Sequence, residues 1–89
     1  MIQRPITIIN KLGLHARAAA KLVATASEFE SSVEIVKGSQ KVNGKSIMPV
    51  MMLAASKGTE VELHISGPDE EAACDKLVAL IDDYFGEGE

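Results

Sequence analysis

The chain has 89 residues, a formal net charge of -4, one cysteine and no long apolar run. This fits one small domain, residues 1–89, and we expect a cytoplasmic protein with no secretory signal and no membrane partner. One Tyr, two Phe, no Trp and no basic stripe argue against nucleic acid as a partner. The single Cys74 has no disulfide partner within the chain and is interpreted as a small helix residue.

The first predicted element is a strand over Ile2 to Ile9, because this stretch is rich in β-branched residues. Ile2, Ile6 and Ile8 share one face of it. Pro5 cannot donate to a sheet ladder, so it predicts an edge strand.

A helix is predicted from Ala16 to about Phe29, with Gly13 turning the chain into it. Its buried face is formed by apolar residues that recur at helical spacing: Ala19, Leu22, Val23, Ala26 and Phe29.

Two residues at the start of this helix carry candidate chemistry. His15 is expected at or beside the N-cap, where backbone N–H groups lack partners and the helix dipole is positive. Ser, Thr, Asp and Asn usually occupy that position, so His15 is interpreted as serving a purpose other than capping. Arg17 presents a fork of donors suited to phosphate oxygens. The pair predicts an imidazole that carries or contacts a phosphoryl group; the alternative is two solvated side chains.

The middle of the chain predicts a hairpin and a short helix. Val33 and Ile35 alternate with polar residues, Gly38-Ser39 forms the connection, and a third strand follows over Gln40 to Val42. A short helix is predicted from Ser46 to Leu53, with Gly58 as its stop signal.

The last third predicts a strand and a long helix. Apolar and polar residues alternate strictly from Thr59 to Ser66, and His64 is expected on the solvated face. Gly67-Pro68-Asp69 opens the final helix, which Gly86 ends. The buried stripe of this helix is predicted to consist of Ala73, Leu77, Leu80, Ile81 and Tyr84.

The short helix has too many large apolar residues for a helix that buries one side. If Val50 and Leu53 face the core, four others lie nearer the surface as a docking patch: Ile47, Met48, Met51 and Met52. The alternative, that all of them fill the core, fits the pattern equally well.

The order of elements predicts an α+β fold in which helices cover one face of an antiparallel sheet. The segment Gly13-Leu14-His15-Ala16-Arg17, with Asn10-Lys11 before it and Ala19-Ala20 after it, resembles the active-site signature of the histidine-containing phosphocarrier (HPr) family. Lys45-Ser46-Ile47-Met48 is similar to that family's regulatory-serine segment. Two departures are Ala18, where the family usually has proline, and Pro49, often glycine in the family.

The resemblance implies the HPr fold, an open-faced β-sandwich of order βαββαβα with strands in the spatial order 1-4-2-3. It implies a monomeric phosphocarrier of the phosphoenolpyruvate-dependent phosphotransferase system, with neither metal nor cofactor. His15 would accept a phosphoryl group from enzyme I and pass it to enzyme II A domains in sugar uptake or its regulation. The backbone N–H groups of Ala16 and Arg17 and the Arg17 side chain would hold the phosphoryl oxygens.

The resemblance further implies regulatory phosphorylation of Ser46 by an HPr kinase/phosphorylase, whereas Ser46 by itself is an ordinary N-cap residue. It places Ala20 beside the methionine-rich helix on the docking surface. The chain would relay a group rather than act as an autonomous enzyme. Two alternatives are a regulatory paralogue of the nitrogen branch and a non-catalytic regulatory binding module that uses the same surface. A phosphohydrolase would need a nearby acid/base group, and none lies near the motif in sequence.

Overall fold

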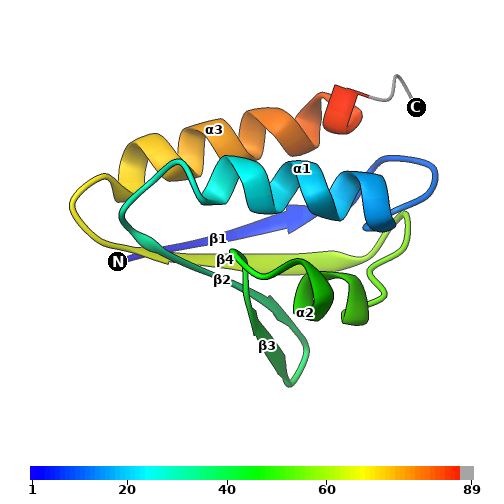
Figure 1. Cartoon of the computed structure of the whole chain (residues 1–89). Coiled ribbons are helices and arrows are strands. Elements are labelled where there is room, and N and C mark those ends of the chain that lie inside the picture. Colours follow the sequence, from blue (N-terminus) through cyan, green and yellow to red (C-terminus); the bar gives the residue numbers. More distant parts are fainter. Residues whose placement is uncertain (87–89) are drawn as a thin grey trace.

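The computed structural model describes residues 1–86. Its elements are β1 (Ile2–Thr7), α1 (Ala16–Ala26), β2 (Ser32–Lys37), β3 (Gln40–Asn43), α2 (Ile47–Met52), β4 (Glu60–Ser66), α3 (Glu70–Asp82) and a 3₁₀ turn, η1 (Tyr84–Gly86). The strands form an antiparallel sheet in the order β1-β4-β2-β3, which confirms the expected topology. Figure 1 shows α1 and α3 side by side over one face of the sheet, with α2 beside β3.

The core lies between the sheet and the helices. Strand β4 supplies it with Val61, Leu63 and Ile65, as its alternating sequence predicted. Strand β1 is an edge strand, and its Pro5, opposite Glu62, is tolerated there. Cys74 is buried in this core, and the burial raises the pKa of its thiol, so it is a packing residue. No helix within residues 1–86 is long and apolar enough to cross a membrane.

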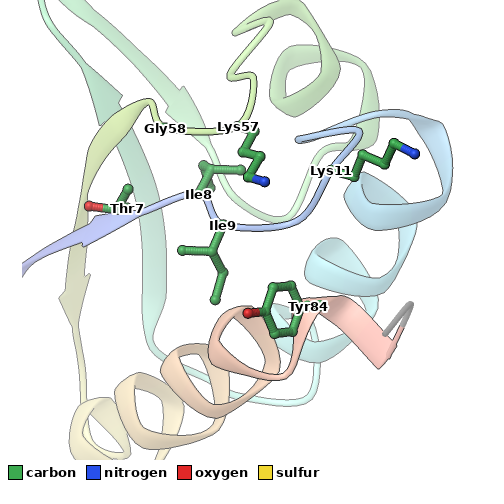
Figure 2. A pocket seen from close by; sticks show the side chains of 7 residues that line it. All are labelled: Thr7, Ile8, Ile9, Lys11, Lys57, Gly58 and Tyr84. Carbon is green, nitrogen blue, oxygen red and sulfur yellow. The ribbon is translucent and has the colours of Figure 1, made fainter. Parts of the chain in front are cut away.

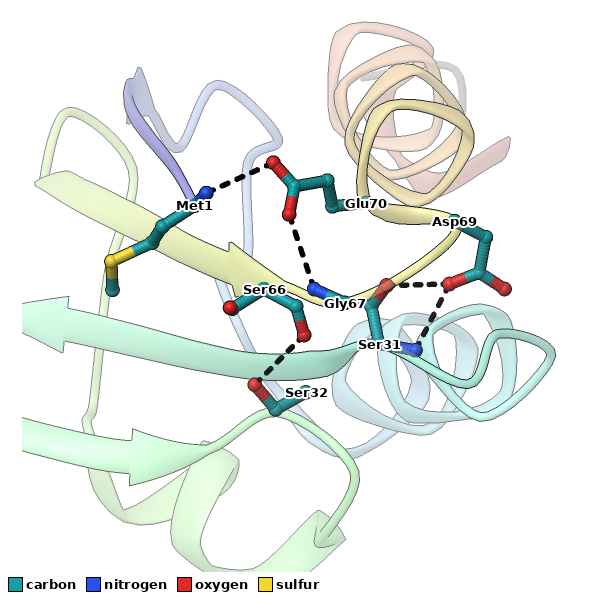
Figure 3. A network of polar contacts seen from close by, with 7 residues as sticks. All are labelled: Met1, Ser31, Ser32, Ser66, Gly67, Asp69 and Glu70. Carbon is teal, nitrogen blue, oxygen red and sulfur yellow. Dashed lines mark hydrogen bonds and ion pairs between the residues drawn. The ribbon is translucent and has the colours of Figure 1, made fainter.

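A polar network ties the start of α3 to the segment before β2 (Figure 3). The Asp69 carboxylate accepts hydrogen bonds from the backbone N–H and hydroxyl of Ser31 and from the N–H of Glu30. Glu70 accepts from the N–H of Gly67 at 3.1 Å and pairs with the N-terminal amine of Met1 at 3.1 Å. These bonds fix the end of the molecule where β1 begins and α3 starts.

Three boundaries differ from the sequence predictions. Strand β1 ends at Thr7 instead of Ile9. Helix α1 ends at Ala26 instead of Phe29, because the next residues form tighter i to i-3 hydrogen bonds. Phe29 still packs against the core from this turn. The stop after α2 is Ala54, which is left-handed with φ +52°, and Gly58 belongs to the following turn.

The buried face predicted for the last helix was also wrong at its C-terminal end, where it included Tyr84. Helix α3 ends at Asp82, and Tyr84 and Phe85 then adopt left-handed backbone angles with φ +56° and +54°. This turn reorients the chain, so Phe85 is fully buried whereas Tyr84 is 38 % exposed.

His64 is not a solvated strand residue. It lies on the central strand β4 between Gln3 of β1 and Glu34 of β2, and its side chain is only 13 % exposed. Its Nε2 pairs with Glu62, and its Nδ1 is buried without a hydrogen-bond partner among residues 1–86.

Candidate phosphoryl site at the start of helix α1

The loop before α1 holds His15 through its own backbone and one buried side chain. Asn10 is fully buried, and its amide donates to the carbonyl of Gly13 at 2.8 Å. The N–H of Gly13 in turn donates to the carbonyl of Asn10 at 3.1 Å. These two bonds close a tight loop from Asn10 to Gly13 and fix the chain two residues before His15.

A second segment supports this loop from behind. The N–H of Leu14 donates to the carbonyl of Ala55 at 2.8 Å. A Cβ atom on Gly13, which has φ +67°, would lie 2.4 Å from that same carbonyl oxygen. Only glycine fits here, because the position needs both a left-handed backbone and close approach of a neighbouring chain. The sequence analysis identified Gly13 but missed Asn10 and Ala55 as supporting residues.

His15 is the N-cap of α1, and contrary to expectation it does cap the helix. Its backbone is extended, and its Nδ1 accepts a hydrogen bond from the N–H of Arg17 at 3.2 Å. A ring nitrogen that accepts a hydrogen bond carries a lone pair, so the proton of the neutral imidazole is assigned to Nε2. The structure therefore aims an unprotonated nitrogen at the exposed N-terminus of α1.

Within residues 1–86, the first turn of α1 next to His15 is exposed on one side. Ala16, Arg17 and Ala20 are exposed, and the first turn of α1 contains no acidic side chain. Ala18 is fully buried within the first turn, where its N–H has no carbonyl four residues earlier to bond within the helix. A proline would lose no helical hydrogen bond there, so alanine is a mild departure from the family pattern.

The exposed apolar residues of α2 form a patch that we call the α2 patch, namely Ile47, Met48 and Met52. They are 40 %, 63 % and 73 % exposed, whereas Val50 and Leu53 are buried as predicted. Met51 differs from expectation, because it is half-buried and packs against the core. Helix α2 packs against α1, so the patch belongs to the same layer as His15.

Leu12, in the loop before His15, is 67 % exposed and was missed by the sequence analysis. An apolar residue at a turn gives no sequence signal that separates an exposed position from a buried one.

Ser46 occupies the N-cap position of α2, as expected. Its hydroxyl makes no capping hydrogen bond, although its carbonyl accepts the first helical bond, from the N–H of Val50 at 3.3 Å. Pro49 lies within the first turn of α2, where its missing N–H is tolerated, so it does not move the helix start away from Ser46.

Charge is strongly segregated along the chain. Residues 1–27 and 35–59 contain no Asp or Glu and carry eight of the nine Lys and Arg residues. All thirteen acidic residues lie in 28–34 and 60–89. His15, Arg17 and the α2 patch all belong to the acid-free segments, so this region is suited to partners with acidic and apolar surfaces.

Comparison with known proteins identifies the family. Residues 2–83 match the family model described as "PTS HPr component phosphorylation site". The chain is 57 % identical to the phosphocarrier protein HPr of Neisseria meningitidis over 89 residues, which is all of both chains. An HPr crystal structure from Thermoanaerobacter tengcongensis superimposes with a TM-score of 0.94 at 50 % identity and covers 98 % of each chain.

Two further relatives broaden the comparison. A protein of Shewanella violacea, 44 % identical over 97 % of this chain and 94 % of its own, is named phosphocarrier protein NPr. A second Thermoanaerobacter tengcongensis structure, with a TM-score of 0.79 at 52 % identity over 92 % of this chain and 94 % of its own, is an HPr dimer. The full-length match in sequence and in fold shows that this chain belongs to the HPr family of the phosphotransferase system.

Proposed function

We propose that residues 1–89 act as one phosphocarrier domain that accepts a phosphoryl group from phospho-enzyme I on His15 and passes it to enzyme II A domains. The observation that carries the proposal is the geometry of His15, whose Nδ1 lone pair faces the Arg17 N–H at the open start of α1. A helix N-terminus of this kind binds anions through its unpaired N–H groups.

The transfer step uses this geometry directly. The Nδ1 lone pair attacks phosphorus, an Nδ1–P bond forms, and the bond between phosphorus and the donor's phosphorylated group breaks. The N–H of Arg17, which had donated to Nδ1, is then free to donate to a phosphoryl oxygen. The Arg17 guanidinium adds a charged donor fork. Because these donors are exposed, they hold the group without burying it, and transfer to the next acceptor stays possible.

Docking of both partners is assigned to the α2 patch together with Ala20. The flexible methionines Met48 and Met52 suit a surface that must fit several proteins in turn. A charge placed at Met48 should weaken binding to enzyme I and leave the melting temperature nearly unchanged. The matched charge at the half-buried Met51 should lower the melting temperature instead.

The proposal is tested by intact-mass measurement after incubation of the protein with enzyme I and phosphoenolpyruvate. The wild type should gain one acid-labile phosphoryl group, and His15→Ala should gain none. His64→Ala is the matched control and should be phosphorylated like the wild type, because His64 lies on the sheet and not at a helix start. Labile phosphate on His15→Ala would refute the assignment.

Phosphorylation of Ser46 by an HPr kinase/phosphorylase is proposed as the regulation of this step. A phosphate there adds about -1.5 to -2 charges next to Ile47 and the rest of the α2 patch. Burying that charge against an acidic partner surface is costly, so Ser46→Asp should slow phosphorylation of His15 by enzyme I. Acid-stable phosphate mapped to another residue after treatment with the kinase and ATP would refute the site, and a wild-type rate for Ser46→Asp would refute the mechanism.

The NPr name of one relative keeps a regulatory nitrogen branch as the second candidate function. Assays with purified enzyme I of each branch separate the two candidates, because the correct enzyme I should phosphorylate the chain much faster. A non-catalytic binding module would accept no phosphoryl group from either. We propose that the chain works as a monomer, and sedimentation of the phosphorylated protein tests that state against the dimer known for one relative.

A further inference from the structure

A cleft of about 740 Å³ opens where β1 ends, beside the loop that leads to α1. Its floor is formed by Ile8 and Ile9, and Lys57 and Gly58 form one wall (Figure 2). Tyr84 lies on the opposite side of Ile9, and Lys11 stands at the rim. Neither His15 nor Arg17 lines it, so the cleft is separate from the proposed phosphoryl site.

The two lysines of this cleft differ from the other five in the chain. Lys21, Lys37 and Lys45 donate to backbone carbonyls, and Lys41 and Lys76 pair with carboxylates. Lys11 and Lys57 have neither kind of partner among residues 1–86. No Asp or Glu among residues 1–86 lines the cleft; Lys57 points into it, and Lys11 lies at its rim.

Tyr84 is held in place by strain and by burial of its neighbour. Its left-handed backbone, φ +56°, continues into Phe85, which is fully buried, and Lys21 Nζ donates to the Phe85 carbonyl at 2.6 Å. A strained backbone persists only where the surroundings enforce it. The aromatic ring is thereby kept at the cleft as a fixed apolar surface.

We propose that this cleft binds a small phosphate monoester with a flat apolar body. Two ammonium groups match the two charges of a phosphate monoester, and lysine binds phosphate well as a point charge. Ile9 and Tyr84 offer an apolar surface to the rest of the ligand. The volume lies within the range of small-molecule sites, which combine an apolar lining with a few polar groups.

The test is an amide NMR titration of the full chain with phenyl phosphate as the probe. The largest shifts should fall on Ile9, Gly58 and Tyr84. The double variant Lys11→Gln/Lys57→Gln should weaken binding about fivefold to tenfold, because it removes both cations. The matched control Lys76→Gln removes a lysine that pairs with Glu28 on another surface and should bind like the wild type. Shifts confined to Ala16 and Arg17, or an unchanged affinity in the double variant, would overturn the proposal.

Two simpler probes test the flat body of the ligand. Inorganic phosphate should bind several times more weakly than phenyl phosphate, and neutral phenol should bind more weakly still. Tyr84→Ala should reduce the affinity for phenyl phosphate but not the affinity for inorganic phosphate. Equal binding of inorganic phosphate and phenyl phosphate to the wild type would overturn the assignment of an apolar body.

Discussion

The two long helices begin at opposite ends of the molecule, and their N-termini are treated in opposite ways (Figure 1). Helix α3 carries Glu70 and Glu71 in its first turn, and the carboxylate of Asp69 before it accepts hydrogen bonds from Ser31. Helix α1 has no acidic residue in its first turn, and within residues 1–86 the side chain that caps it is the imidazole of His15. Acidic side chains of the chain itself lie at the start of α3, whereas the first turn of α1 has none.

Polar groups at a helix start can therefore stabilise the fold or bind a ligand, and the two helices differ in this respect. Carboxylates at a helix start stabilise the fold because their negative charge complements the positive end of the helix dipole. An N-terminus without them forgoes that stabilisation and keeps its donors available. The predictions below disturb one helix start at a time.

The largest effect is expected from Gly13→Ala, which disturbs the support behind His15. The new Cβ would collide with the Ala55 carbonyl in a left-handed position, so the free energy of unfolding should fall by about 3 kcal/mol. Urea denaturation measures the loss. Gly38→Ala is the matched control, since it has φ +59° but open space around it, and should lose only about 1 kcal/mol. Equal losses would mean that the contact with Ala55 is unimportant.

Arg17→Ala should disturb the open helix start without disturbing the fold. The side chain is exposed, so stability should change little, while the loss of a charged donor should slow phosphoryl transfer about tenfold. Arg17→Lys should recover part of the rate, because it restores the charge but not the donor fork. Rapid-quench measurement of transfer from phospho-enzyme I gives the rates. A wild-type rate for Arg17→Ala would show that the backbone N–H groups suffice.

Asp69→Asn disturbs the other helix start and should affect stability alone. Hydrogen bonds from Ser31, then from the Glu30 N–H, hold the pKa of Asp69 below its ordinary value of 3.8. The Gly67 N–H and the N-terminal amine do the same for the pKa of Glu70. A lowered folded-state pKa gives stability that is present above the ordinary pKa and lost as the pH falls below it.

The urea concentration at which half of the wild-type protein is unfolded should therefore decrease as the pH is lowered from about 5 to about 3. In Asp69→Asn it should start lower at neutral pH and decline less steeply. His15 phosphorylation at pH 7 should be unchanged in this variant. If the urea midpoints of the two proteins changed with pH in parallel, Asp69 would not contribute to the loss of stability in acid.

The smallest effect is expected from Ala16→Glu, which makes the start of α1 resemble that of α3. The carboxylate should stabilise the helix by about 0.5 kcal/mol. It should also slow phosphoryl transfer several-fold, because it places a negative charge where the phosphoryl group must arrive. Melting temperature and transfer rate should thus change in opposite senses. A variant that is stabilised and transfers at the wild-type rate would contradict the idea that α1 is left open for an anion.

The features that could be predicted from the sequence are those set by local residue patterns. The strict alternation of β4, the edge position of Pro5 and the helical start after His15 all follow from local residue preferences. The strand order came from family resemblance, because pairing between strands distant in the chain leaves no local signal. The position of His15 at the helix start was predictable for the same local reason.

The predictions that were wrong concern features that are set by tertiary packing. Ala54 and Tyr84 adopt left-handed backbone angles that favour glycine, so their sequence gave no turn signal. The half-burial of His64 arises because β4 is a central strand, which a single strand's pattern does not reveal. Met51 and Met48 are three residues apart on one helix, and only packing against the core distinguishes them.

The most direct test of the central claim is to identify the phosphorylated ring nitrogen of His15. Long-range proton–nitrogen NMR spectra of the uniformly nitrogen-labelled protein, recorded before and after treatment with enzyme I and phosphoenolpyruvate, distinguish Nδ1 from Nε2. Because Nδ1 accepts the Arg17 N–H and Nε2 carries the proton, the phosphoryl group should appear on Nδ1, and the Arg17 amide signal should shift strongly. Phosphorylation at Nε2, or an Arg17 amide that does not move, would contradict the account.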